Sequence, residues 1–201
     1  FNGFGQLSLR TDFKGQKTQF VYDVLGRLQS KNLYAVGSPS PNQVIAFGYD
    51  ELGRQNSVTD ARGITTNTYD LEGRLTQVVS PEGTINYEYD PATGRKTKTF
   101  TANSETQYGY ELGRLKTVTV VKRSGVILAT PEVVTYNYTD VGSREALTLP
   151  NGVQTSYQYD SLNRLTKLSN LNAGNQVLSS YQYTLAPNGR RTAIAETRME
   201  S

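Results

Sequence analysis

A short motif, Tyr-Asp-x-x-Gly-Arg-Leu, recurs along this chain and limits the folds that it can adopt. The first full copy spans residues 22–28, and copies begin near residues 1, 22, 49, 69, 89, 110, 138, 159 and 183. The first copy carries soft substitutions, with Phe1 for Tyr, Asn2 for Asp and Gln6 for Arg. A unit of about 20 residues fits two short strands and two turns, so the spacing predicts a repeat architecture.

The recurring motif predicts that residues 1–201 form a single array of about nine copies. Phe1 occupies the Tyr position of its copy, and neither end shows a capping sequence. Because repeat arrays need capped ends, we expect the chain to be a fragment of a longer repeat protein. The longer spacings contain insertions at residues 32–42, 122–131 and 170–175, whose composition predicts loops.

The composition favours a thin sheet over a thick core. Hydrophobic residues make up 36% of the chain, below the roughly 45–50% that is usual in globular domains. The net charge is only +3 and there are 14 tyrosines, which is not typical of a disordered chain. The chain has no cysteine and no histidine, which excludes disulfides, thiol nucleophiles and histidine bases. No apolar run approaches the roughly 18 residues of a membrane span.

The residues before each motif predict a half-buried strand. In residues 84–89 the apolar side chains of Ile85, Tyr87 and Tyr89 alternate with polar ones, which is the period of a strand with one buried face. The position two before the motif Tyr is aromatic in most copies, and Asn67 is an exception. Since side chains two apart point the same way, each strand carries an aromatic pair on one face.

The motif itself predicts a turn. Asp accepts hydrogen bonds from nearby backbone N–H groups, and Gly adopts positive φ at low cost. Asn163 replaces the Gly in one copy, and Asn also tolerates the left-handed region, so a backbone role for this position is favoured over ligand binding. Arg or Gln follows in every copy. The motif residues expected to have this structural role are Tyr22, Asp23, Gly26, Arg27, Tyr49, Asp50, Gly53, Arg54, Tyr69, Asp70, Gly73, Arg74, Tyr89, Asp90, Gly94, Arg95, Tyr110, Gly113, Arg114, Tyr138, Arg144, Tyr159, Asp160, Asn163, Arg164, Tyr183, Gly189 and Arg190.

These signals together predict an all-β fold, an antiparallel meander of β-hairpins that forms a curved, twisted strip with rows of tyrosines. Further turn signals at residues 60–63, 80–83 and 150–152 divide each repeat into two strands. A parallel β-solenoid of similar period is the alternative. Two turns per repeat favour the hairpins.

The recurring Tyr-Asp-x-x-Gly-Arg-Leu resembles the YD repeats of the Rhs family over essentially the whole chain. Related arrays occur in Rhs effectors, in the B and C components of Tc toxins, in wall-associated bacterial proteins and in teneurins. The resemblance implies a β-sheet strip that winds into a hollow shell, of which this chain would be a part. It also implies an exported or cell-surface bacterial protein.

The resemblance implies a structural, non-enzymatic role in enclosing or shielding a toxin or other cargo domain. Its partners would be the rest of the parent shell and an enclosed C-terminal domain, with self-association through open strand edges. In toxin members a core rich in Asp-Pro closes the shell. Here Asp90-Pro91 aligns with an ordinary repeat turn, and no toxin-like tail follows Arg191.

Four other functions compete with this interpretation. A carboxylate pair for glycoside hydrolysis is expected at positions that depart from the repeat, whereas the acids here occupy the same turn position of the motif. The spacing of a calcium loop is missing, and no cofactor or metal is expected. Each Arg follows a turn Asp by four residues in the regular copies, so local pairing explains it better than nucleic-acid binding. The main rival is a carbohydrate-binding or adhesion surface lined with tyrosines.

Overall fold

The structure is a computed structural model, and it describes residues 1–199. All the regular elements in this range are β-strands, which confirms the expected all-β class and excludes a helical fold. The chain divides into two compact units, residues 1–88 and the residues from 89 onward. A single array over residues 1–201 stays a prediction from the motif.

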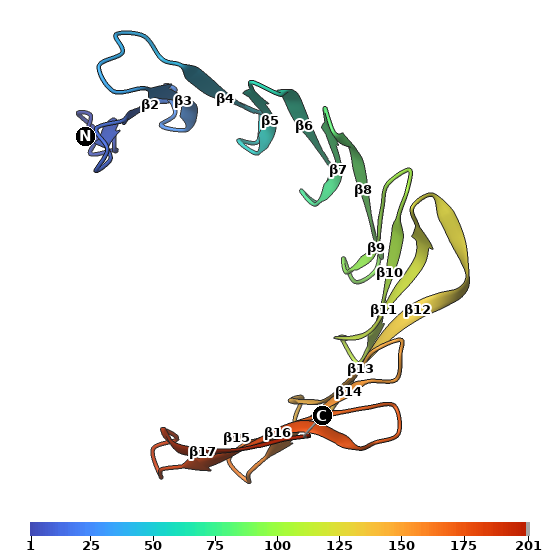
Figure 1. Ribbon diagram of the computed structural model, residues 1–201. Coiled ribbons are helices and arrows are strands. Elements are labelled where there is room, and N and C mark those ends of the chain that lie inside the picture. Colours follow the sequence, from blue (N-terminus) through green and yellow to red (C-terminus); the bar gives the residue numbers. More distant parts are fainter. Residues whose placement is uncertain (200–201) are drawn as a thin grey trace. The chain divides into compact units, whose positions relative to one another are not determined.

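Unit 1 is an antiparallel meander in which every strand pairs with the next one along the chain. Consecutive hairpins thus lie side by side, as Figure 1 shows for the blue to green strands. The strands are β1 (Leu9–Thr11), β2 (Lys17–Tyr22), β3 (Leu28–Tyr34), β4 (Gln43–Tyr49), β5 (Gln55–Asp60), β6 (Gly63–Tyr69), β7 (Leu75–Ser80) and β8 (Gly83–Tyr89).

Unit 2 has the same organisation, and its strands also pair consecutively and antiparallel. This pairing confirms the meander and rules out the parallel solenoid. The strands are β9 (Lys96–Phe100), β10 (Glu105–Glu111), β11 (Arg114–Arg123), β12 (Val126–Tyr138), β13 (Arg144–Thr148), β14 (Gln154–Tyr159), β15 (Leu165–Leu171), β16 (Val177–Leu185) and β17 (Arg191–Arg198).

Each motif hairpin contains one extra residue. Tyr22 pairs with Leu28, whereas the preceding Val21 pairs with Ser30, so Gln29 lies opposite no residue of its own. The same register shift precedes the motif tyrosines of β4, β6, β12 and β14. Such a bulge increases the local twist of the strands. It also puts the motif Tyr and the Leu that follows the turn on one face.

The pairing sorts side chains onto two chemically different faces. On the face that we call the aromatic face, Tyr157 pairs with Leu168, and Leu168 pairs with Tyr181. On the opposite face Ser156 lies between Ala146 and Ser169. Among residues 1–199 only Ala146 and Ser169 are buried, with 7% and 6% of their surface exposed. Small side chains therefore make the tightest packing, and the aromatic side chains are half-buried within a single layer.

The insertion at residues 122–131 differs from the expected loop. It forms most of the outer end of the β11–β12 hairpin, which reverses at Ser124 and Gly125. Both residues have positive φ, 50° and 82°, which is the pair of values that a two-residue type I′ turn requires. In the sequence, Ser124 followed by Gly125 is the signal for this turn. In the described part of the chain no helix is long and apolar enough to cross a membrane.

Candidate functional site

The Asp of each regular motif organises its own turn. In β4–β5 the Asp50 N–H donates to the Arg54 carbonyl and the Gly53 N–H donates to the Asp50 carbonyl, both at 2.9 Å. The Oδ1 atom of Asp50 accepts the N–H groups of Leu52 and Arg54, at 3.0 and 2.9 Å. Gly53 has φ of +79°, the left-handed region that disfavours a side chain. This is a type I turn followed by a bulge, the usual three-residue hairpin.

The other carboxylate oxygen binds the motif arginine. The Nε of Arg54 lies 2.6 Å from Oδ2 of Asp50. The same pair forms at Asp23–Arg27, Asp70–Arg74 and Asp160–Arg164, at 2.6 to 2.7 Å. These contacts show the local pairing that the spacing predicts.

Hydrogen bonding determines the pKa of these acids. Partial desolvation works to raise the pKa of Asp50, but hydrogen bonds from the side chain and backbone of Arg54 outweigh it and hold the pKa below its ordinary value. The pKa values of Asp23 and Asp70 are lowered against the same opposing effect. At Asp160 the backbone N–H of Arg164 is the largest cause of the lowered pKa. The acids are thus stabilised as carboxylates, which suits a turn and not a general acid.

The motif arginine also reaches the next repeat. The guanidinium of Arg54 lies 4.6 Å from the centroid of the Tyr69 ring, and its Nη1 donates to the Asp70 carbonyl at 3.3 Å. A side chain at Gly73 would place its Cβ 3.7 Å from the same Nη1. This is an ordinary contact distance, so the glycine is required by its positive φ and not by the arginine of the preceding repeat. Sequence reasoning missed the contact of Arg54 with the next repeat, because it joins residues of different motifs.

The motif tyrosine forms a hydrogen bond to the backbone of the preceding repeat. The Tyr69 hydroxyl donates to the Gln55 carbonyl at 2.7 Å, and Gln55 is the residue that follows Arg54. The equivalent bond joins Tyr22 to Leu7, Tyr49 to Leu28, Tyr110 to Lys96, Tyr138 to Leu115 and Tyr159 to Arg144, at 2.8 to 3.0 Å. We call the combination of the Arg–Tyr contact and the Tyr–carbonyl bond the inter-repeat contact. It joins successive hairpins within each unit.

Asn and Gln replace the ion pair without changing the turn. Asn2 accepts the N–H groups of Phe4 and Gln6 through Oδ1 and donates from Nδ2 to the Gln6 side chain at 2.9 Å. The Gln6 amide then donates to the Gly26 carbonyl of the next turn at 2.9 Å. Asn172 and Gln176 form the same turn at the opposite end of the strands, where the sequence motif was not expected.

Two motif assignments differ from the sequence interpretation. Thr139 and Ser143 close the turn that follows Tyr138, so Arg144 lies one position later and pairs with Tyr138. The last turn runs from Ala186 to Arg190, and Leu185 occupies the motif Tyr position. Tyr183 lies two residues before it, in the position of the second aromatic. Neither shift is visible in the sequence, because a Tyr and an Arg still flank each turn.

Two further copies change the length of the turn. At Asp90 the Gly94 N–H donates to the Asp90 carbonyl, so this turn is one residue longer, and Oδ1 accepts Thr93. After Tyr110 the turn shortens to Leu112 and Gly113, with φ of 48° and 81°. Neither copy has the Asp–Arg ion pair in the part of the chain that the structure describes.

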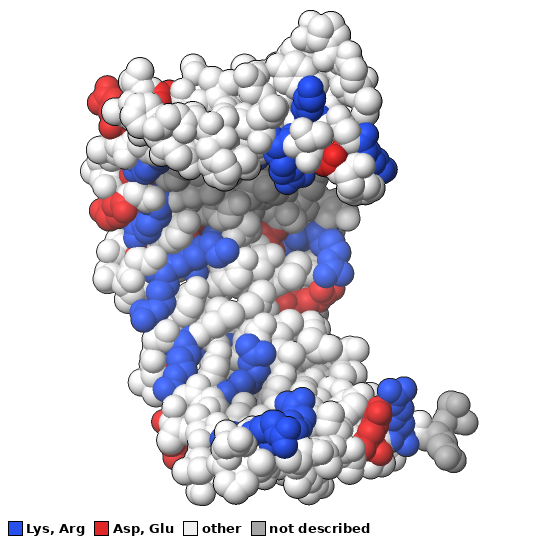
Figure 2. Space-filling view, turned by 90° about the vertical axis from the view of Figure 1, so that its left-hand side faces the viewer, with Lys and Arg blue, Asp and Glu red and all other residues white. Residues whose placement is uncertain are grey.

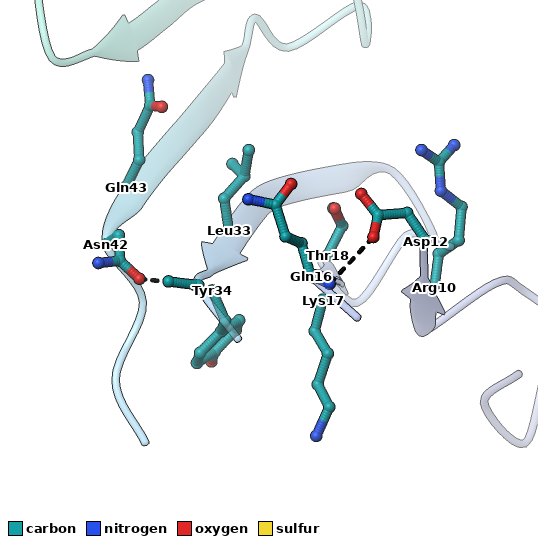
Figure 3. Close-up of a pocket in the computed structure, with 10 residues that line it drawn as sticks. Arg10, Asp12, Gln16, Lys17, Thr18, Leu33, Tyr34, Asn42 and Gln43 are labelled. Carbon is teal, nitrogen blue, oxygen red and sulfur yellow. Dashed lines mark hydrogen bonds between the residues drawn. The ribbon is translucent and has the colours of Figure 1, made fainter. Parts of the chain in front are cut away.

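A hollow of about 430 Å³ lies at the far ends of β2, β3 and β4 in unit 1. Figure 3 shows Arg10, Asp12, Leu33 and Gln43 directed to one side of the sheet, and Lys17 and Tyr34 directed to the other. Asp12 accepts the Gln16 N–H and so repeats the turn geometry. One carboxylate bound in a turn does not form a catalytic pair.

The charged groups are distributed along the strands. Figure 2 shows Lys and Arg side chains over much of the visible face, with most acidic side chains near its margins. Within residues 1–199 no cluster of three acidic side chains could hold a metal ion.

Residues 144–175 match the family model described as RHS Repeat. The chain contains an RHS repeat. This match, on β13 to β15, confirms the resemblance to the Rhs/YD-repeat family that the motif predicts. The matched segment includes Tyr159, Asp160, Asn163 and Arg164, and so contains a complete turn with its ion pair. A comparison with curated proteins found no match.

Solved structures share the fold of the RHS-repeat chain. A crystal structure of TcdB2-TccC3 matches with a TM-score of 0.70 and 20% identity. The same assembly without its hypervariable C-terminal region matches with 0.70 and 19%, and a form named TcdB2-TccC3-TEV with 0.69 and 19%. Each match covers 96% of this chain and 12% of the other. The chain therefore spans about an eighth of the length of the structures that it matches.

Proposed function

We propose that this chain is a non-enzymatic structural section of a longer RHS-repeat wall, which encloses or shields another part of the same polypeptide or complex. The observation that carries the proposal is the inter-repeat contact. The same Arg–Tyr and Tyr–carbonyl geometry recurs from hairpin to hairpin, and it uses the charged and polar groups of the motif in joining them.

The chemistry of the motif supports a structural role. The carboxylates of Asp23, Asp50, Asp70 and Asp160 each bind their own arginine. A catalytic carboxylate needs a reacting partner within hydrogen-bond reach and a pKa suited to proton transfer. Here the hydrogen bonds lower the pKa of each acid, so these groups remain charged near neutral pH.

The proposed partners follow from the fold and the resemblance. The chain aligns with about an eighth of the TcdB2-TccC3 structures, which fits one section of a larger repeat assembly. The parent wall would supply the neighbouring strands, and an enclosed C-terminal domain would be the cargo. Open strand edges would also allow self-association. The resemblance favours export from a bacterium, as a component of a toxin.

Limited proteolysis of the parent polypeptide tests this function. The variant Arg54→Gln with Tyr69→Phe removes one inter-repeat contact, and Lys14→Gln, at an exposed turn, is the matched control. We expect the segment outside the repeats to resist protease in the wild type and the control, and to be cleaved faster in the double variant. Equal cleavage of that segment in all three proteins would show that the wall does not shield it.

A carbohydrate-binding or adhesion surface is the alternative. The hydroxyls of Tyr22, Tyr49, Tyr69, Tyr138 and Tyr159 already bind backbone carbonyls, which leaves them less able to bind sugar hydroxyls. A glycan array separates the two functions. Retention of the wild-type chain on defined glycans, lost when half-buried tyrosines are replaced by leucine in a folded variant, would favour the adhesion surface.

A further inference from the structure

Three arginines of unit 2 differ from those of the regular copies in their ion pairing, which Arg164 of the same unit keeps. In unit 1 the guanidinium groups of Arg27, Arg54 and Arg74 each bind the Asp of their own turn. In unit 2 neither Arg95 nor Arg114 has an ion pair with any described residue within 4 Å. The same holds for Arg144. Arg95 directly precedes β9, and Arg114 and Arg144 begin β11 and β13, so the three arginines belong to alternate strands of one sheet.

The three side chains are nevertheless held in place. The guanidinium of Arg95 lies 5.8 Å from the Tyr110 ring centroid, and that of Arg114 lies 5.7 Å from the Tyr138 ring centroid. A Cβ at Gly113 would be 3.0 Å from Nη2 of Arg95, so this arginine rests against the next turn as Arg54 does. Arg95 and Arg114 are therefore positioned as in the regular copies, whereas the guanidinium of Arg144 lies 5.3 Å from the Tyr136 ring centroid of its own hairpin.

The turns explain why the carboxylate is missing. The turn before Arg114 has only two residues, and Glu111 there binds Lys116 at 3.1 Å. In the longer turn before Arg95, Oδ1 of Asp90 accepts the N–H groups of Ala92 and Thr93. Before Arg144 the equivalent residue is Thr139. Among the described residues no carboxylate oxygen lies within 4 Å of these three guanidinium groups, and the Asp90 charge acts on Arg95 only from a longer distance.

We propose that Arg95, Arg114 and Arg144 form a binding surface for an acidic peptide segment. The regular copies show which ligand this guanidinium accepts, a carboxylate oxygen at 2.6 to 2.7 Å from Nε. Charge-assisted hydrogen bonds to carboxylate are among the stronger polar contacts in proteins. A partner that supplies carboxylates would provide at these three arginines the ion pair that the turns of the regular copies supply internally.

The spacing defines the peptide. Arginines on alternate strands are about 9.5 Å apart in the direction of strand pairing. Three residues of polyproline II rise about 9.3 Å, so an extended segment with an acidic residue at every third position matches the row. Phosphates of nucleic acid carry the same sign of charge and are the competing ligand class. The surface is independent of the shell proposal, since it needs only unit 2.

Fluorescence anisotropy with the full 201-residue chain tests the surface. The probes are labelled (Glu-Pro-Pro)₄, (Lys-Pro-Pro)₄ and a single-stranded oligothymidine. We expect (Glu-Pro-Pro)₄ to bind at low salt, with an affinity that falls as salt screens the charges. Arg95→Gln with Arg114→Gln should weaken it roughly tenfold or more, because two charge-assisted contacts are lost. Arg54→Gln, whose arginine already has its Asp, should change it less than about twofold.

Three outcomes would overturn the proposal. They are no binding of (Glu-Pro-Pro)₄ at low salt, equal loss in the Arg54→Gln control, or tighter binding of oligothymidine that is lost in the same double variant. If circular dichroism shows that the double variant is unfolded, Arg144→Gln replaces it. Arg144 is exposed and makes no turn contact through its side chain, and this variant should weaken (Glu-Pro-Pro)₄ several-fold. An unchanged affinity in Arg144→Gln would also count against the surface.

Discussion

The Tyr49 hydroxyl donates a hydrogen bond of 2.8 Å to the Leu28 carbonyl. The two residues are 21 positions apart and belong to successive motifs, and the guanidinium of Arg27 lies 4.7 Å from the same tyrosine ring. The Tyr49 side chain therefore contacts both a backbone carbonyl and a charged guanidinium group of the preceding hairpin. In a single-layer sheet, where only Ala146 and Ser169 of residues 1–199 are buried, such contacts replace much of what a core provides.

Removing this hydroxyl tests its contribution. Tyr49→Phe keeps the ring beside Arg27 and removes the bond to Leu28, so we expect a loss of about 1 kcal/mol in the free energy of unfolding. Urea denaturation followed by circular dichroism measures it. The control is Tyr34→Phe, whose hydroxyl bonds to the exposed Gln19 side chain and should matter less. Equal stability of Tyr49→Phe and the wild type would contradict this role.

Replacing the turn glycine by alanine is expected to destabilise the fold more than replacing it by asparagine. Gly53 has φ of +79°, and Asn163 takes the equivalent place with φ of +59°. Gly53→Ala should lower the free energy of unfolding by about 1–2 kcal/mol, the cost of a left-handed alanine. Gly53→Asn should cost less, because Asn tolerates this region. The comparison of the two urea midpoints decides the matter, and an alanine variant as stable as the asparagine variant would show no backbone requirement.

The amide copies predict a tolerated double substitution. Asn2 with Gln6 makes the turn that Asp50 with Arg54 makes. We expect Asp50→Asn with Arg54→Gln to unfold at a higher urea concentration than Asp50→Ala, which leaves the N–H groups of Leu52 and Arg54 without their acceptor. Urea denaturation of the two variants checks the order. The reverse order would mean that the charge, and not the turn geometry, is what the motif requires.

The lowered pKa values predict sensitivity to acid. The folded-state pKa values of Asp23, Asp50, Asp70 and Asp160 lie below their unfolded values, so the folded chain binds fewer protons. Their stabilising contribution is fully present above about pH 4, the usual pKa of Asp, and is lost as the pH falls through the lowered values. Melting temperatures between pH 6 and pH 2 should decline in that window. Carboxyl NMR titrations with pKa values above the ordinary range would refute the assignment.

The parts of the fold that the sequence could predict are local. Asp50, Gly53 and Arg54 lie within five positions, and their turn needs no other part of the chain. The alternation in residues 84–89 likewise predicts β8. The assignments at Arg144 and Tyr183 were displaced, because strand register depends on the neighbouring strand. The inter-repeat contact was also missed, since Arg54 and Tyr69 belong to different motifs.

The sequence by itself determined the hairpin repeat, because Asp, Gly and alternating aromatics act through hydrogen bonds and backbone angles over a few residues. Only the tertiary structure decided which arginine meets which tyrosine, and which arginines of unit 2 have no ion pair with a residue that the structure describes. Pairing brings together residues about 20 positions apart, and one bulge or one residue of turn length moves a side chain to another neighbour. Strand register therefore determined the contacts that the motif alone could not specify.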